Sequence, residues 1–211
     1  RASTASLEAL MAQKPDLILD IGNRDKTHLA AATHLWQHTG IPSLVMDGEL
    51  AASPAQIRQL AALLGKESRG EALALLAEIL LGHAIRLRQN NDRPPTRIYY
   101  GRGHDGLETG LAGALNLEVI TEAGAINVAS ALGQGHLRRI SPEQLLTWDP
   151  DIILTQSPHF TQQLYCDTRW KHLSAVRKQQ AYLLPATPFG WIDGPTGINR
   201  LLGLQWLLTL L

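Results

Sequence analysis

Apolar and polar residues in the first part of the chain form short blocks that predict helix, strand, helix and strand in turn. Residues 6–19 predict a short helix opened by a serine, then a β-rich run that starts at a Pro-Asp pair. Residues 28–39 predict a helix that a glycine ends, and the apolar run at 41–48 predicts a second strand. Such alternation is typical of a parallel α/β sheet.

A long helical stretch follows. Ser53 and Pro54 resemble an N-cap and a first helical position. From Glu67 to Asn90 the apolar residues recur near a 3.6-residue period, which predicts a helix of about 24 residues and roughly 36 Å. These apolar residues are Leu73, Leu76, Ile79, Leu80, Ile85 and Leu87. A helix of that length can act as a stiff strut between two lobes.

The remaining residues predict a second, larger α/β lobe. Strands are expected at TRIYYG, at LEVI and at AYLLPA, and GAINVA is expected to turn into another short element. Helices are expected from about Leu107 and again at the C-terminus, where PFGWIDGPTGINR leads into the last one. The segment SPHFTQQLYCDTRW is expected to be a polar loop.

One fourteen-residue segment occurs twice. Residues 6–19 (SLEALMAQKPDLIL) and residues 141–154 (SPEQLLTWDPDIIL) share seven identical positions, 135 residues apart. This separation is too large for a solenoid, whose repeat is roughly 20 to 50 residues, so it indicates two similar lobes. The expected division is 1–52 for the remainder of an N-terminal lobe, 53–92 for a linking helical segment, and 93–211 for a C-terminal lobe. A cleft between two lobes is a common ligand site.

The composition of the chain limits the classes of partner that it is expected to bind. The 211 residues are 45% hydrophobic, and 19 acidic side chains balance 19 basic ones. No net field therefore favours nucleic acid or an anionic membrane, and small molecules or proteins are the expected partners. The single Cys166 excludes an internal disulfide and a cysteine-based zinc cluster. The apolar run at 201–211 is shorter than the roughly 20 residues that a helix needs to span a bilayer, so we expect a core-facing helix there. No signal sequence is seen at Arg1.

A glycine pattern raises an alternative. Gly101, Gly103 and Gly106 follow a predicted strand, precede a predicted helix and spell G-x-G-x-x-G, with Glu122 further along. This is the dinucleotide fingerprint, in which glycines let backbone N–H groups approach a pyrophosphate. Asp105 opposes it, because its carboxylate would face that pyrophosphate. A glycine-rich loop lining a cleft is the favoured interpretation, and a nucleotide-binding oxidoreductase is the alternative.

The sequence contains no other motif of an enzyme. It has no H-E-x-x-H, G-x-S-x-G or Walker pattern. His34 and His38 have the i, i+4 spacing of a metal-binding pair, but no third acidic or cysteine ligand is near, so a solvated helix face is favoured. We therefore expect a protein that is not an enzyme, with no catalytic residues, metal ligands or cofactor of its own.

Four blocks together resemble the periplasmic substrate-binding proteins of metal-chelate ABC importers, the class that binds cobalamin, ferric siderophores or haem. They are the two repeated segments, the long helix to Asn90, and GAINVA at the position of the family's Gly-Gly-x-Asn turn. The closing segment PFGWIDGPTGINRLLGLQWL is also similar to the family's C-terminal block. The resemblance implies two Rossmann-like lobes joined by a long helix, an iron or other metal chelate as ligand, and an ABC permease in the inner membrane as partner.

The resemblance also implies a location and leaves the ligand open. Proteins of this kind are periplasmic, or are lipoproteins tethered at the outer face of the cytoplasmic membrane. Siderophore, haem, cobalamin and an oxyanion such as molybdate remain candidate ligands. A third interpretation, beside an importer component and a nucleotide-binding oxidoreductase, is a protein scaffold that only docks a partner.

The family differs from this sequence at the start. Its members carry a further portion of the first lobe, with its own strands and a signal sequence, ahead of the block at Ser6. The first lobe is therefore expected to be truncated at its N-terminus, either as a fragment or as an unusual short member. Such a lobe would expose a strand edge and apolar surface, which favours self-association.

The resemblance assigns roles to three residues. Glu8 and Glu143 occupy equivalent places in the two repeats and match the acidic pair that docks against arginines of the permease in this family. A carboxylate in the first turn of a helix also stabilises the helix dipole, by about 0.3 to 1 kcal/mol, and that is the alternative role. Trp191 lies where the family presents an aromatic side chain to the ligand; partial burial under the last helix is its alternative.

Strand ends supply the remaining candidates. Arg102 and His104 follow the strand TRIYYG at its carboxyl end, where open α/β sheets bind ligands. Tyr99 and Tyr100 alternate across that strand, so one should face the helix layer while the other, taken as Tyr100, approaches the cleft. In the first lobe Arg24 follows the Pro-Asp strand and could pair with a carboxylate or phosphate of a chelate. Solvated loop charge is the alternative for both arginines and for His104.

Overall fold

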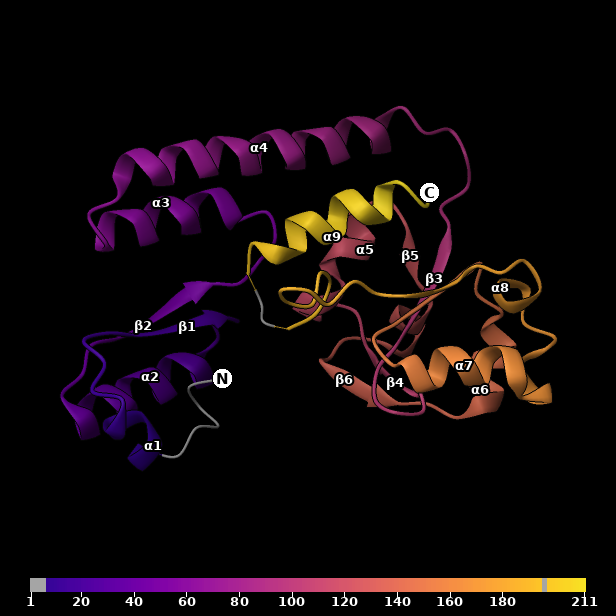
Figure 1. Ribbon diagram of the computed structural model, residues 1–211, viewed down its shortest axis with the longest axis horizontal. Helices are drawn as coiled ribbons and strands as arrows, with labels where there is room; N and C mark the ends of the chain where they lie inside the picture. Colours follow the sequence, from indigo (N-terminus) through magenta and orange to yellow (C-terminus); the bar gives the residue numbers. More distant parts are fainter. Residues whose placement is uncertain (1–6, 195–196) are drawn as a thin grey trace. The chain divides into compact units, whose positions relative to one another are not determined.

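The computed structural model describes residues 7–194 and 197–211 (Figure 1). The chain divides into two compact units, the first ending at Leu75 and the second starting at Leu76. The boundary lies inside the long helix α4 (Glu67–Gln89), within the segment that was expected to link two lobes. Each unit contains parallel strands and helices, which confirms the α/β fold class.

The first unit is a parallel strand pair with helices. Strand β1 runs beside β2 with Ile18 opposite Ser43. The second helix begins where Asp25 accepts hydrogen bonds from the backbone N–H groups of Thr27 and His28, both at 2.9 Å, and it ends at Gly40 in the left-handed conformation. The elements of this unit are α1 (Leu7–Ala12), β1 (Ile18–Gly22), α2 (Lys26–Thr39), β2 (Ser43–Asp47) and α3 (Ser53–Leu63).

The second unit is built on a four-stranded sheet with the order β5-β3-β7-β8, in which every neighbouring pair is parallel. Its strands are β3 (Arg97–Gly101), β5 (Ile126–Asn127), β7 (Ile152–Thr155) and β8 (Ala181–Leu183). A separate antiparallel pair joins β4 (Glu108–Gly110) to β6 (Leu137–Arg139).

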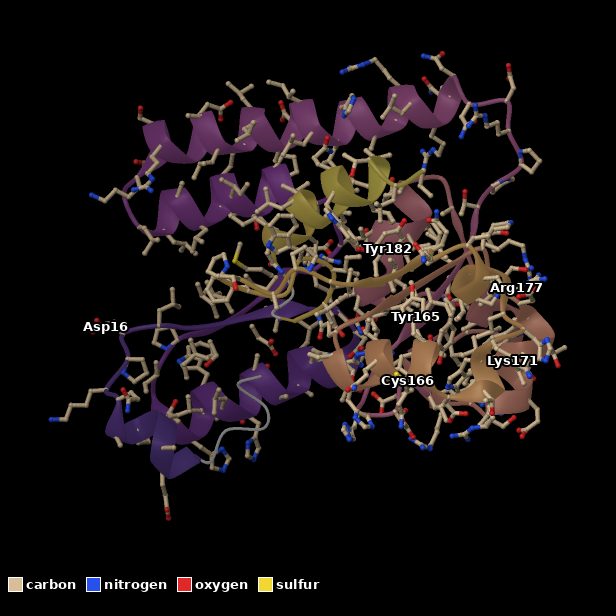
Figure 2. The ribbon with its side chains drawn as sticks, turned by 45° about the vertical axis from the view of Figure 1, so that its right-hand side comes forward. Asp16, Tyr165, Cys166, Lys171, Arg177 and Tyr182 are labelled. Atoms are coloured by element: carbon tan, nitrogen blue, oxygen red, sulfur yellow. The ribbon has the colours of Figure 1, made fainter. Side chains whose placement is uncertain are left out.

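Helices lie on both sides of this sheet. Figure 1 shows α5 (Glu118–Glu122) and α9 (Asn199–Leu208) together on one side, and α6 (Pro142–Trp148) and α7 (Pro158–Cys166) on the other. The short helix α8 (Ser174–Arg177) precedes β8. Figure 2 shows two tyrosines of this region, Tyr165 on α7 and Tyr182 on β8; the Tyr165 hydroxyl donates to the carbonyl of Ala181 at 3.5 Å.

The sequence repeat is a structural repeat. Its first copy forms α1 and β1, and its second copy forms α6 and β7, each as a short helix followed by a parallel strand. Ser141 caps the second copy, because its hydroxyl accepts the backbone N–H of Gln144 at 3.2 Å, whereas Ser6 lies outside the described residues. The two Pro-Asp pairs differ: Asp151 accepts the backbone N–H of Arg97 at 2.9 Å, while Asp16 is exposed (Figure 2).

Two predicted elements of the second unit are wrong. Residues from Leu107 form β4 instead of a helix, because a turn brings Glu108 back into an antiparallel bridge with Arg102. The segment LEVI is helical instead of extended: Leu117 ends a 3₁₀ turn, and Val119 and Ile120 are buried in α5. Packing of α5 against α9 overrides the β-propensity of these branched residues.

The predicted polar loop at SPHFTQQLYCDTRW is also wrong. It contains α7, whose N-cap Ser157 accepts the backbone N–H of Phe160 at 3.1 Å, with Pro158 at the first helical position. Phe160 and Leu164 lie one turn apart and are both buried. The second unit also contains 3₁₀ turns at Leu115–Leu117, Val128–Leu132 and Thr168–Trp170.

Helix α4 has the predicted length but buries an unexpected face. Its buried positions are the small residues Gly70, Ala74, Ala77 and Ala84. A Cβ atom at Gly70 would lie 2.1 Å from the Cβ of Ala61 in α3, so only glycine permits this approach. Of the six aliphatic residues that set the predicted period, five are instead 39% to 63% exposed and Leu80 is half-buried; the exposed five are Leu73, Leu76, Ile79, Ile85 and Leu87.

The last helix is part of the core, as predicted. Leu201, Leu204 and Leu207 of α9 are buried, and the buried Arg200 donates to Glu118 of α5 at 3.0 Å and to the carbonyl of Leu115 at 2.6 Å. Within the described ranges no helix combines the length and apolar character needed to cross a membrane.

Candidate ligand-binding site

A pocket of about 460 Å³ opens in the second unit at the carboxyl ends of β3 and β7. The strand register places Gly101 opposite Thr155, so Arg102 and Gln156 follow from adjacent strand ends. This is the edge of a parallel sheet at which ligands bind. The pocket is lined by Arg102, Gly103, His104, Glu108, Gln156 and Ser157.

Ion pairs and a buried hydroxyl organise the pocket wall. The Nε of Arg102 lies 2.5 Å from Oδ2 of Asp193, and its NH1 lies 3.5 Å from Oε1 of Glu108. The hydroxyl of Tyr100 donates to the same Oδ2 of Asp193 at 3.0 Å. Asp193 therefore attaches the loop before α9 to the end of β3.

Tyr99 and Tyr100, one of which was expected to approach the cleft, are both fully buried, and neither lines the pocket. The Tyr99 hydroxyl donates to the carbonyl of Gly106 at 2.8 Å. Burial, and then the nearby Asp193 carboxylate, raise the pKa of Tyr100 well above its ordinary value, and burial raises the pKa of Tyr99 as well. Tyr100 positions Asp193 instead of forming part of the pocket surface.

Two histidines stack beside the pocket. The rings of His104 and His159 lie 3.8 Å apart between centroids with an angle of 20° between their planes, and both side chains are exposed. Ser157 fixes this arrangement, since its hydroxyl donates to the carbonyl of His104 at 2.9 Å while it caps α7. The structure thus brings Arg102 and His104 into one pocket.

The glycines of the G-x-G-x-x-G segment allow close packing. A Cβ at Gly101 would lie 2.6 Å from the Gly106 carbonyl, and a Cβ at Gly106 would lie 2.0 Å from the ring of Phe160. Gly103 and Gly106 also have positive φ angles of 74° and 66°, which side chains other than glycine rarely adopt.

The same segment lacks the context of a dinucleotide site. It leads into the antiparallel strand β4 and not into a helix, so no helix N-terminus follows to receive a pyrophosphate. Asp105 is paired with Arg139, and this hydrogen bond holds the pKa of Asp105 below its ordinary value. The expected strand-loop-helix arrangement is therefore wrong, and the oxidoreductase alternative loses its structural basis.

Trp191 lies in the loop that carries Asp193. It is half-buried, and its Nε1 donates to the carbonyl of Thr187 at 3.1 Å. Its carbonyl packs against α9, where a Cβ at Gly203 would lie 2.0 Å from that oxygen. The pocket lining does not include Trp191.

The remaining candidates are not among the residues that line this pocket. Arg24 is exposed in the turn between β1 and α2 of the first unit, where the neighbouring Asp25 caps α2. Glu8 is exposed in the first turn of α1. Glu143 is exposed in the first turn of α6, and hydrogen bonds from its own backbone N–H and from Ser141 lower its pKa.

Four residues of the site were not predicted from the sequence: Glu108, Gln156, Ser157 and Asp193. Gln156 and Ser157 could have been found, because they follow the strand of the second repeat just as Arg102 follows β3. Glu108 depends on the turn before β4, and Asp193 depends on a contact with a strand about ninety residues earlier. Across residues 7–194 and 197–211, no three or more His, Cys, Asp or Glu side chains form a group able to hold a metal ion.

Comparison with known proteins gives a family match over most of the chain. Residues 2–188 match the family described as periplasmic binding protein. An ABC transporter solute binding protein from Sulfurospirillum deleyianum has a solved structure similar to this fold, with a TM-score of 0.86 and 28% identity, covering 96% of this chain. The chain covers 64% of that structure, which is less than two thirds of its length.

Two further relatives bind different ligands. The molybdate-binding protein MolA of Haemophilus influenzae is 32% identical over 91 residues, which are 42% of this chain and 25% of MolA. A structure of MolA bound to molybdate has a TM-score of 0.77 at 22% identity, covering 98% of this chain and 68% of that one. The structure of the vitamin B12 binding protein BtuF of Vibrio cholerae has a TM-score of 0.77 at 24% identity, covering 98% of this chain and 77% of BtuF.

The buried tyrosines predict a loss of stability at high pH. Because the pKa of Tyr100 is raised in the folded protein, the folded state keeps a proton that the unfolded chain releases above about pH 10, the ordinary tyrosine pKa. The free energy of unfolding should therefore be constant with respect to this group below pH 10 and should fall as the pH rises further.

Tyr100→Phe tests this. The substitution should lower the free energy of unfolding by about 0.5 to 1.5 kcal/mol at pH 8, because the hydrogen bond to Asp193 is lost. Between pH 10 and 11.5 the free energy of unfolding of the variant should fall less steeply with pH, by the slope that corresponds to about one proton. Urea unfolding followed by circular dichroism at several pH values measures both. Equal slopes for the two proteins would show that Tyr100 ionises as freely when folded as when unfolded.

Proposed function

The chain belongs to the periplasmic binding protein family, and from that premise we propose that it is the substrate-binding component of an ABC importer. In this role it captures a small metal-containing ligand outside the cytoplasmic membrane and delivers it to the permease. It acts in the periplasm, or tethered at the outer face of that membrane, and performs no chemistry on the ligand. The observation that carries the proposal is the polar pocket at the carboxyl ends of two parallel strands, in a fold that aligns over 96% of its length with a solute binding protein.

The proposed ligand is an iron or other metal chelate of the siderophore, haem or cobalamin type. The similarity to BtuF supports this class, and the stacked His104 and His159 offer a flat, exposed surface for a planar or aromatic ligand. Molybdate is the second candidate, and the identity to MolA over 91 residues favours it.

The predicted residues take distinct parts in this proposal. Arg102 and His104 contact the ligand at the pocket, and Tyr100 acts through Asp193. Trp191 presents part of its indole from a loop held by Thr187 and α9. Arg24 contributes a positive charge from the first unit.

Glu8 and Glu143 are proposed to dock the permease. Both are exposed, and both lie in the first turn of the repeated helix. Hydrogen bonds from its own backbone N–H and from Ser141 lower the pKa of Glu143 at the start of α6, so docking and helix stabilisation must be separated by experiment.

A ligand screen tests the proposed function. Haem, cobalamin, several ferric siderophores and molybdate should be added separately to the chain while its melting temperature is measured. A true ligand at a hundredfold excess over its Kd should stabilise the native state by about 2.7 kcal/mol. His104→Ala should reduce this shift, whereas His172→Ala, an exposed histidine outside the pocket lining, should not. If no compound raises the melting temperature, the substrate-binding role is contradicted.

Charge reversal tests permease docking. Glu8→Lys and Glu143→Lys should each reduce vesicle uptake and permease binding while ligand affinity stays unchanged, and the double variant should lose more than either. Glu67→Lys is a matched control, because Glu67 is also an exposed carboxylate in a first helical turn. If the carboxylates only stabilise their helices, each reversal will lower stability by under about 1 kcal/mol and uptake by the double variant will be normal.

A further inference from the structure

The charge balance of the pocket differs from that of an anion site. Arg102 is the one lysine or arginine among the six lining residues, and its guanidinium faces two carboxylates, Asp193 at 2.5 Å and Glu108 at 3.5 Å. One positive and two negative side chains leave this cluster with a formal charge of about −1. An oxyanion entering here would meet two carboxylates that already compete for the guanidinium.

The position of Asp193 strengthens that competition. Its side chain is only 13% exposed and receives the buried Tyr100 hydroxyl as well as Arg102. A carboxylate held by two donors keeps its place more firmly than one with a single partner. Arg102 is therefore not poised to exchange Asp193 for an external anion.

The start of α7 does not restore an anion site. Pro158 at the first helical position has no N–H, and the N–H of Phe160 is bound by the Ser157 hydroxyl at 3.1 Å. The N–H of Ser157 itself donates to the Thr155 hydroxyl at 3.1 Å. Three of the groups that could face an anion at a helix N-terminus are thus absent or already used.

We propose that this pocket selects a neutral or cationic metal chelate over a free oxyanion, and that Asp193 is a specificity-determining residue. Its carboxylate pairs with the Nε–H of Arg102, for which an oxyanion would have to compete, while the Glu108 carboxylate accepts hydrogen bonds from ligand N–H or O–H groups. Suitable ligands are a cationic ferric hydroxamate or a neutral corrinoid with amide donors. The inference rests on the proposed function and narrows its ligand class.

Three probes of different charge test the inference: a cationic ferric trihydroxamate, neutral cyanocobalamin, and sodium molybdate. Isothermal titration of the wild-type chain at low salt should give an affinity for the trihydroxamate or the cobalamin at least tenfold higher than for molybdate. Asp193→Asn should raise molybdate affinity about tenfold and reduce affinity for the trihydroxamate. Glu108→Gln should act in the same direction by a few-fold.

Two controls keep the test decisive. Asp167→Asn removes another carboxylate paired with an arginine, Arg169, outside the pocket lining, and should change no affinity by more than twofold. Circular dichroism should show each variant folded, and if Asp193→Asn does not fold, Glu108→Gln, at a side chain that is 44% exposed, decides by itself.

The outcomes separate the inference from the proposed function. Molybdate as the tightest wild-type ligand, or no gain in molybdate affinity in the variants, would overturn the inference while leaving a substrate-binding role intact. If the wild-type chain binds none of the three probes nor any compound of the wider screen, the proposed function fails and the inference with it.

Discussion

The carboxylate of Asp193 joins parts of the second unit that are distant in sequence. It receives a hydrogen bond from Tyr100 on β3 and an ion pair from Arg102, the residue just beyond that strand. Through these two contacts the loop before α9 is held against the carboxyl edge of the sheet. A polar group that is only 13% exposed must be satisfied in this way, because a buried carboxylate without partners is strongly destabilising.

The geometry of the pocket follows from the parallel sheet and from close packing beneath it. Adjacent strands β3 and β7 end opposite each other, so the residues that follow them share one edge. Gly101 and Gly106 let the backbone lie directly against the ring of Phe160, and Ser157 ties the start of α7 to His104. The polar side chains of the pocket are thus displayed from a tightly packed base, which suits a binding site that must keep its shape without ligand.

Much of the architecture could be predicted from local patterns. The repeat, the long helix and the strands TRIYYG and AYLLPA were visible because their periods and end signals are strong. The failures have physical causes. LEVI carries β-branched residues but is helical through its contact with α9, and α4 buries alanines and a glycine because small side chains allow closer helix packing than leucines do. Only part of the candidate site could be predicted from the sequence. Arg102 and His104 follow a recognisable strand end, whereas Asp193 joins Arg102 through a tertiary contact that no local pattern encodes.

The central claim is that the carboxyl edge of β3 and β7 is the ligand site. Mapping of amide and indole shifts by nuclear magnetic resonance, with a saturating amount of the tightest-binding metal-containing ligand, tests it most directly. The largest changes should fall on Gly103, His104, Gln156 and Ser157, together with the Nε–H of Arg102. Changes clustered elsewhere in the chain, with these five groups unaffected, would contradict it.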